Sequence, residues 1–177
     1  MCSSDSLNID LKALKADDTH LVFSLADDYF SSLEGAEVSK GSVTVALDIH
    51  KTADRCFDLS FHISGQVAVA CDRCLDEMEQ GIDTSARLFA KLGDGYAEDD
   101  DLVTVDESSG TLNLAWFIYQ FVVLGIPIKH VHAPGKCNRA MIQMLEEHSA
   151  TRSGDGGRQP AMDPRWSELL KLKETKD

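Results

Sequence analysis

The residues best suited to chemistry are two cysteines in the run Cys71-Asp72-Arg73-Cys74. Two cysteines separated by two residues can turn both sulfurs toward one point, a geometry that serves a zinc ion or a redox dithiol. One such pair supplies only half of the ligands of a tetrahedral zinc site. The other two ligands must therefore come from elsewhere in the chain.

The only dense supply of further ligands is the segment 129–137, which contains two histidines and a cysteine. The sequence thus predicts a Cys₃His zinc site that joins the cysteine pair to this segment. The predicted ligands are Cys71, Cys74, His132 and Cys137, with His130 as the alternate histidine. The competing interpretation is that the cysteines are ordinary core and strand-end residues and the histidines surface residues.

A thiol-redox function is the main alternative for the same cysteines. A strand leads into the motif, as in thioredoxin-like proteins. However, the neighbouring strands predict an antiparallel meander and no βαβ unit. Acidic neighbours also disfavour a thiolate; these are Asp72, Asp76, Glu77 and Glu79. The sequence has no P-loop, dinucleotide glycine fingerprint or HExxH motif, and nothing marks an oxyanion hole for a Cys137 nucleophile.

Basic side chains gather late in the chain. Residues 1–128 contain 8 basic and 23 acidic side chains, a net charge of −15, whereas residues 129–177 contain 9 basic and 7 acidic ones, a net charge of +2. The total charge of −13 argues against nucleic acid covering the whole surface, but a local phosphate contact is possible. Simple solubilising charge is the alternative. The candidate contact residues for RNA or a partner are Arg73, Lys129, Lys136, Arg139, Arg165, Trp166 and Lys171.

The elements that must position these residues are mostly strands. Alternation of apolar and polar side chains predicts strands at 7–11, 20–25, 43–49, 57–63, 67–71, 82–92 and 102–105. Turns are predicted at 51–54 and at Ser64-Gly65, and a solvated acidic loop at 93–101. A short helix is expected at 27–33, capped by Asp27 or Asp28. Successive strands with tight turns predict an antiparallel meander with one face in the core.

Two helices are predicted in the second half of the chain. The apolar stretch 112–124 indicates a buried helix that stops at Gly125 and Pro127 and is too short to span a bilayer. A second helix is expected at 138–148. We therefore predict an α+β protein: an antiparallel, barrel-like β-meander with one buried apolar helix and short C-terminal helices.

The predicted organisation is a single domain over 1–148, a flexible linker over 149–162, and a C-terminal docking helix and tail over 163–177. Asp163 is the expected N-cap of that helix, followed by Pro164. An odd count of five cysteines and an N-terminus without a signal-like run favour a reducing cytoplasm and no membrane association.

The order of these features resembles the YceD-like family, the large ribosomal RNA subunit accumulation proteins. The resemblance runs from about residue 7 to 173. It rests on the motif 71–75, the helix end Gly125-Ile126-Pro127, the downstream Cys137, and the closing run 163–169 of Asp-Pro-Arg-Trp-Ser-Glu-Leu.

The resemblance implies a non-enzymatic role in synthesis, processing or stability of large-subunit ribosomal RNA. The implied partner is that RNA or its precursor, or a basic ribosomal protein. Many relatives carry a second cysteine pair after the apolar helix, and here His132 and Cys137 could replace it. A CxxC-dependent redox protein and a zinc-stabilised scaffold without an RNA link remain the alternatives.

Overall fold

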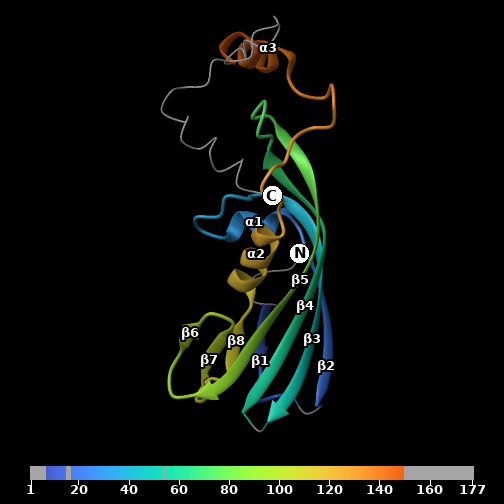
Figure 1. The fold of residues 1–177 in the computed structure, drawn as a ribbon. Coiled ribbons are helices and arrows are strands. Elements are labelled where there is room, and N and C mark those ends of the chain that lie inside the picture. Colours follow the sequence, from blue (N-terminus) through green and yellow to red (C-terminus); the bar gives the residue numbers. More distant parts are fainter. Residues whose placement is uncertain (1–6, 15–16, 54, 150–177) are drawn as a thin grey trace, which may run out of the picture. The chain divides into compact units, whose positions relative to one another are not determined.

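The computed structural model describes residues 7–14, 17–53 and 55–149 of the chain (Figure 1). The chain divides into two units, residues 1–142 and 143–177. Both sheets, two of the helices and all candidate zinc ligands belong to the first unit, which is described by itself below.

A six-stranded sheet dominates the first unit, with the order β2-β3-β4-β5-β7-β6. Its strands are β2 (Asp18–Leu25), β3 (Gly41–Ala53), β4 (Cys56–Ala70), β5 (Glu77–Gly93), β6 (Ala97–Asp99) and β7 (Leu102–Asp106). A second, two-stranded sheet pairs β1 (Asn8–Asp10) with β8 (Thr111–Asn113). The α+β class and the meander from β2 to β5 agree with the prediction.

Two features of the sheet differ from the predicted barrel-like, wholly antiparallel arrangement. β7 pairs with β5 in parallel, from Phe89↔Leu102 to Gly93↔Asp106. This follows because β6, inside the predicted acidic loop, carries the chain back along the edge and then pairs antiparallel with β7. The sheet order ends at β2 and β6, and among the described residues no closed barrel is found.

The turn predicted at Ser64-Gly65 is wrong, because β4 continues through it as one strand of 15 residues. Gly65 pairs with Val43 on one side and Ile82 on the other. Its φ is +153°, and a Cβ there would lie 2.2 Å from the carbonyl oxygen of Ser42. Glycine is required here by the close approach of two strands, which a local pattern cannot distinguish from a turn.

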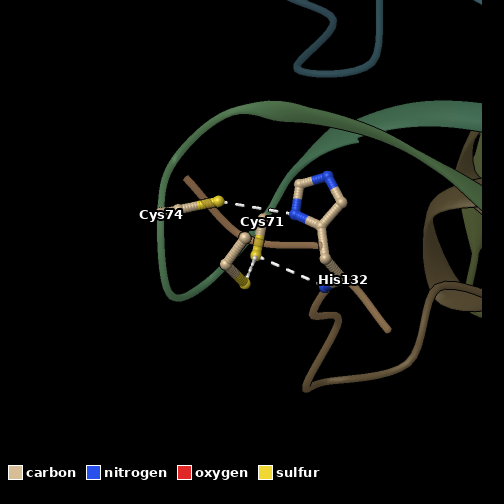
Figure 2. A group of neighbouring side chains, drawn as sticks. Cys71, Cys74 and His132 are labelled. Atoms are coloured by element: carbon tan, nitrogen blue, oxygen red, sulfur yellow. Dashed lines mark hydrogen bonds between the residues drawn. The ribbon is translucent and has the colours of Figure 1, made fainter. Parts of the chain in front are cut away.

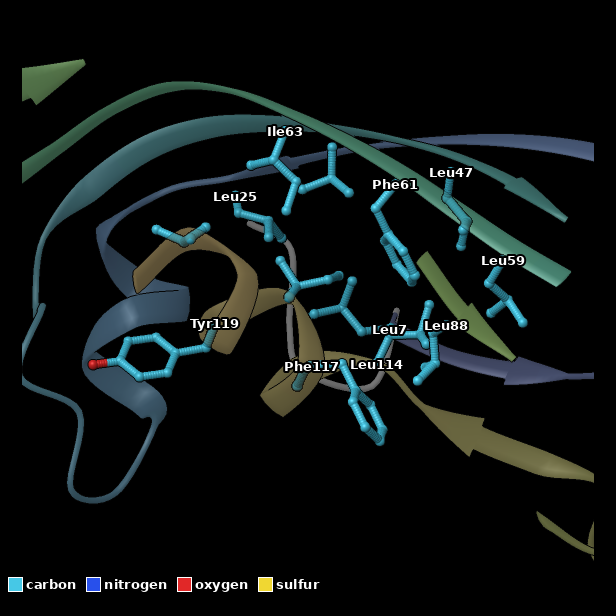
Figure 3. Packing of buried hydrophobic residues seen from close by; sticks show 14 of the residues in the cluster. Leu7, Leu25, Leu47, Leu59, Phe61, Ile63, Leu88, Leu114, Phe117 and Tyr119 are labelled. Carbon is cyan, nitrogen blue, oxygen red and sulfur yellow. The ribbon is translucent and has the colours of Figure 1, made fainter. Parts of the chain in front are cut away.

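The hydrophobic core lies between the long sheet and the helices α1 (Asp27–Ser32) and α2 (Ala115–Leu124) (Figures 1 and 3). The inward face of β3 and β4 supplies Leu47, Leu59, Phe61 and Ile63, as the alternation predicts. α2 begins later than predicted, because residues 111–113 form β8 instead. Buried on several sides, this helix lacks a strong apolar stripe.

The remaining helices also depart from the prediction in detail. α1 begins after Ala26, which makes no side-chain capping bond, so the predicted cap is wrong. Asp27 instead accepts a hydrogen bond from the backbone N–H of Gly41 at 2.8 Å and thereby fixes the start of β3. α3 (Arg139–His148) forms where the second helix is predicted. The predicted docking helix at 163–177, and the linker except Ser149, lie outside the described residues.

Candidate metal centre

Four side chains from two distant parts of the chain converge on one point. The Cys71, Cys74 and Cys137 sulfurs and a ring nitrogen of His132 all lie within 4.8 Å of one another. Cys74 Sγ is 3.4 Å from His132 Nδ1 (Figure 2). The Cys71 and Cys137 sulfurs are 3.9 Å apart. A tetrahedral zinc ion with bonds of about 2.3 Å to sulfur sets such sulfurs about 3.8 Å apart, so the donor set has the right size and composition.

The first two ligands are positioned by the connection between β4 and β5. The N–H of Cys71 donates to the Asp76 carbonyl at 2.9 Å, and the N–H of Leu75 donates to the Cys71 carbonyl at 2.9 Å. These bonds close a tight loop that turns both thiols inward, and both are fully or almost fully buried. Leu75 closes the loop with a φ of +61°, a left-handed conformation that costs a leucine about 1–2 kcal/mol.

The other two ligands are held by contacts between Asp72 and the segment after α2. The N–H of His130 donates to Asp72 Oδ2 at 2.8 Å, and the N–H of Asp72 donates to the His130 carbonyl at 3.0 Å. Two residues on, the N–H of His132 points to the Cys71 sulfur at 3.5 Å. Sequence reasoning missed this role of Asp72, because an aspartate between two cysteines reads only as local negative charge.

The geometry distinguishes the two candidate histidines. The His132 ring lies beside Cys74, whereas the His130 ring contacts the Pro127 carbonyl through Nδ1 at 3.0 Å and lies 3.5 Å from Asp72 Oδ1 through Nε2. His130 thus holds the loop and is not a member of the four-residue group.

The protonation of the thiols departs from the expectation of a disfavoured thiolate. Burial raises the pKa of Cys71. The backbone N–H groups of Arg73, His132 and Cys74 lower the pKa by more than burial raises it, so that the pKa is about 5. Backbone donors therefore outweigh the acidic neighbours, of which Asp72 is bonded to His130 and Glu77 is paired with Lys40. Burial and hydrogen bonding to Cys71 and Cys74 raise the pKa of Cys137 to about 11. A metal ion bound by these residues would displace the protons that remain on the thiols.

Comparison with known proteins identifies a family whose model covers the residues of the candidate metal centre. A family model described as large ribosomal RNA subunit accumulation protein YceD matches residues 59–173, a range that includes all four converging residues. The chain belongs to the YceD family. No curated protein and no solved structure matches the chain.

In this YceD-family chain the predicted basic contact residues are only partly described. Arg73, Lys129 and Lys136 are exposed and close in sequence to the metal-site residues, and Arg139 is exposed at the start of α3. Three further candidates, Arg165, Trp166 and Lys171, lie outside the described residues. Within the described part of the chain no helix is long and apolar enough to cross a membrane.

Proposed function

We propose that the protein is a non-enzymatic accessory factor for the synthesis, processing or stability of large-subunit (23S) ribosomal RNA. It acts in the cytoplasm by binding that RNA, its precursor or a basic ribosomal protein. The observation that carries this proposal is the family match over residues 59–173. The matched range includes most of the hairpin formed by β4 and β5 and all residues of the candidate metal centre. The charge of −15 over residues 1–128 supports a basic partner for the body of the protein.

Zinc is the metal that we propose for the Cys71, Cys74, His132 and Cys137 group. Three thiols and an imidazole are its preferred donors, and four protein ligands leave no open position for a substrate. Such an ion supplies a cross-link between the end of the β4–β5 hairpin and the chain after α2. It stabilises a surface and supports no turnover.

The decisive experiment on function is depletion of the protein in cells, with the ratio of large-subunit to small-subunit ribosomal RNA as the readout. We expect depletion to lower the ratio and the wild-type chain to restore it. An unchanged ratio would contradict the ribosomal role and leave a zinc-stabilised scaffold.

Zinc is tested separately. The full chain purified without chelator should contain one zinc ion per chain by mass spectrometry, and Cys74→Ser should contain none. Cys56→Ser, at the exposed end of β4, should contain as much zinc as wild type.

A thiol-redox protein is the second candidate, because the pKa of Cys71 is lowered to about 5. Burial of the Cys71 sulfur argues against it, since a redox thiol must be reached by another sulfur. An insulin-reduction assay with dithiothreitol separates the two functions. Turnover that is lost in Cys74→Ser and kept in Cys56→Ser would establish the redox function.

A further inference from the structure

An apolar groove lies directly beside the candidate metal centre. It has a volume of about 470 Å³ and lies between the end of β4, residues 37–38, and the chain at and beyond the end of α2. Its apolar walls are Val38, Val69, Leu75, Val123, Ile126 and Ile128. Cys71 and Asp72 also line it, so the metal centre and the groove share one wall.

The groove exists because β3 and the chain before it separate from β4. The last paired residues of the two strands are Gly41 and Val67, and one further hydrogen bond runs from the Ala68 N–H to the Lys40 carbonyl at 3.0 Å. Before Lys40 the chain is drawn toward α2. The Tyr119 hydroxyl accepts hydrogen bonds from the N–H groups of Glu37 at 2.7 Å and Val38 at 3.2 Å.

This separation leaves one position of the strand edge, Ala70, open inside the groove. On the same side, the Ala68 N–H bonds to the Lys40 carbonyl and the Asp72 N–H bonds to the His130 carbonyl. Ala68, Val69 and Ala70 pair with β5 on one side, and no described strand pairs with Ala70 on the other. Because successive residues of a strand face opposite neighbours, Ala70 directs its N–H and carbonyl to the same side as Ala68, into the gap. An open edge beside an apolar surface is the arrangement to which extended peptides add as a further strand.

Two large apolar side chains at the rim of the groove are exposed to solvent. Ile128 is fully exposed and Leu75 is 69% exposed. Leu75 moreover occupies a left-handed backbone conformation, with a φ of +61°, for which glycine would be the unstrained residue. A strained backbone that presents a large apolar side chain to solvent, next to a groove, is a feature of binding sites.

The charge of the groove selects the class of occupant. Its charged lining residues are Glu37 and Asp72, both acidic, and neither lysine nor arginine lines it. Arg73 and Lys129 adjoin lining residues in sequence without being part of the lining. The body of the chain, residues 1–128, adds a net charge of −15. These charges attract a basic peptide and repel the phosphates of RNA.

We propose that this groove binds an extended segment of a basic protein, whose backbone pairs with the open N–H and carbonyl of Ala70. Alternate apolar side chains of the segment contact Val69, Leu75 and Ile128, and its basic side chains approach Glu37 and Asp72. The inference deepens the proposed function and rests on it, because it selects a basic ribosomal protein over RNA as the partner at this surface.

The test uses the full chain and synthetic probes of defined chemistry. The main probe is a fluorescein-labelled ten-residue peptide of alternating Lys and Val, measured by anisotropy at physiological salt. Two comparison probes are a Lys/Ser peptide of equal charge and a Glu/Val peptide. Two more are Lys/Val peptides with backbone N-methyl groups, one methylated at the odd-numbered residues and the other at the even-numbered residues. We expect the Lys/Val peptide to bind tightest, and one methylated version to bind weakly, because methylation removes the N–H groups that pair with β4.

Variants locate the binding to the groove. Leu75→Ser and Ile128→Ser each remove an exposed apolar side chain, and each should weaken Lys/Val peptide binding about tenfold, the value of one buried aliphatic side chain. Leu75→Gly relieves the backbone strain and should weaken binding equally, so a folding defect cannot explain the loss. Val22→Ser, 58% exposed on β2, is the matched control and should bind like wild type.

Three results would overturn the inference. The first is equal affinity of the groove variants and the wild type for the Lys/Val peptide, and the second is equal affinity of the wild type for the Glu/Val and Lys/Val peptides. The third is displacement of the Lys/Val peptide by a single-stranded RNA 20-mer whose own affinity falls in the groove variants. None of these bears on the depletion result, which tests the proposed function alone. If depletion leaves ribosomal RNA unchanged and the groove still binds the Lys/Val peptide, the proposed function fails and the groove remains a peptide site.

Discussion

The long β4–β5 hairpin has two halves that share one hydrogen-bonded ladder and differ in what covers them. In the first half, residues 57–63 and 84–90, the inward side chains of β4 are all buried in the core, with Leu59 and Ile63 fully inaccessible, and Leu88 and Ala90 of β5 are buried with them. In the second half, residues 66–70 and 77–81, Val67 is the one buried side chain. The candidate metal centre follows directly at the end of this second half.

The difference indicates what the proposed zinc ion would contribute. Apolar burial stabilises in proportion to the area removed from water, so the core holds the packed half along its length and holds the sparse half only through Val67 and Val69 of β4. A two-stranded ribbon without a covered face is only marginally stable in water. The four converging ligands and the Asp72–His130 contacts attach the end of this ribbon to the chain after α2. Burial of apolar side chains thus stabilises one half, and the proposed zinc ion would stabilise the other.

The largest expected effect is in the packed half. Leu59→Ala should lower the free energy of unfolding by about 2–5 kcal/mol, because the lost contacts leave a cavity in the core. Urea denaturation measures this loss, which should be the same with zinc and with chelator. Ser60→Ala, at the next and exposed position of β4, should change stability little. A small effect of Leu59→Ala would mean that the two halves do not differ as described.

Loss of the proposed zinc ion should let the sparse half open at a lower free energy than global unfolding requires. For the wild type, zinc at 100 times its dissociation constant should protect residues 66–80 by about 2.7 kcal/mol, because the ion binds only the closed state. Hydrogen exchange measures this protection, which Cys74→Ser should abolish and Cys56→Ser should keep. Equal protection of residues 66–80 and 57–63 in the absence of metal would contradict the division of the hairpin, because both regions would then open only in global unfolding.

The boundary between the halves is Gly65, and substitution of this glycine by alanine tests it. Gly65→Ala should lower stability by about 1–3 kcal/mol, because the added Cβ would meet the Ser42 carbonyl oxygen and the backbone φ is unfavourable for alanine. Thermal unfolding measures the change. Gly81→Ala, in β5 with open space around its Cα, should be neutral or slightly stabilising. Similar results for both variants would show that the strands can separate at residue 65.

The smallest expected effect is electrostatic and lies on the outer face of the packed half. Hydrogen bonds from Arg87, one of them from Nε at 2.7 Å, hold the pKa of Asp58 below its ordinary value. A lowered folded-state pKa stabilises above the ordinary carboxyl pKa of about 3.9, and the contribution disappears as the pH falls through the folded-state value.

Asp58→Asn should therefore cost at most about 1 kcal/mol at pH 7, since Arg87 is largely solvent-exposed, and nothing in strong acid. Denaturation at pH 7 and pH 2 measures the difference. Asp83→Asn, whose carboxylate is exposed and 3.9 Å from His62, is the control and should show no such pH dependence. A cost that persists at pH 2 would indicate a packing role for Asp58 instead.

The sequence by itself determined the local elements and the chemical inventory. The strict alternation at Val43–Ile49 and Phe57–Ile63 predicts half-buried strands because side chains of a strand alternate between faces. The spacing of Cys71 and Cys74, with His132 and Cys137 as the dense supply of further ligands, predicts the group that the structure brings together. The strand alternation and the spacing within each ligand pair depend on residues that are close along the chain. The joining of the two pairs followed from the four ligands that a tetrahedral zinc ion needs.

Only the tertiary structure decided what depends on contacts between distant residues. Gly65 reads as a turn until Val43 and Ile82 are seen on either side of it. The parallel place of β7 depends on the path of residues 94–101, and the choice of His132 over His130 depends on Asp72, 58 residues earlier than His130. The groove exists because Tyr119 binds the backbone of residues 37 and 38, a contact across 81 or more residues that no local period encodes.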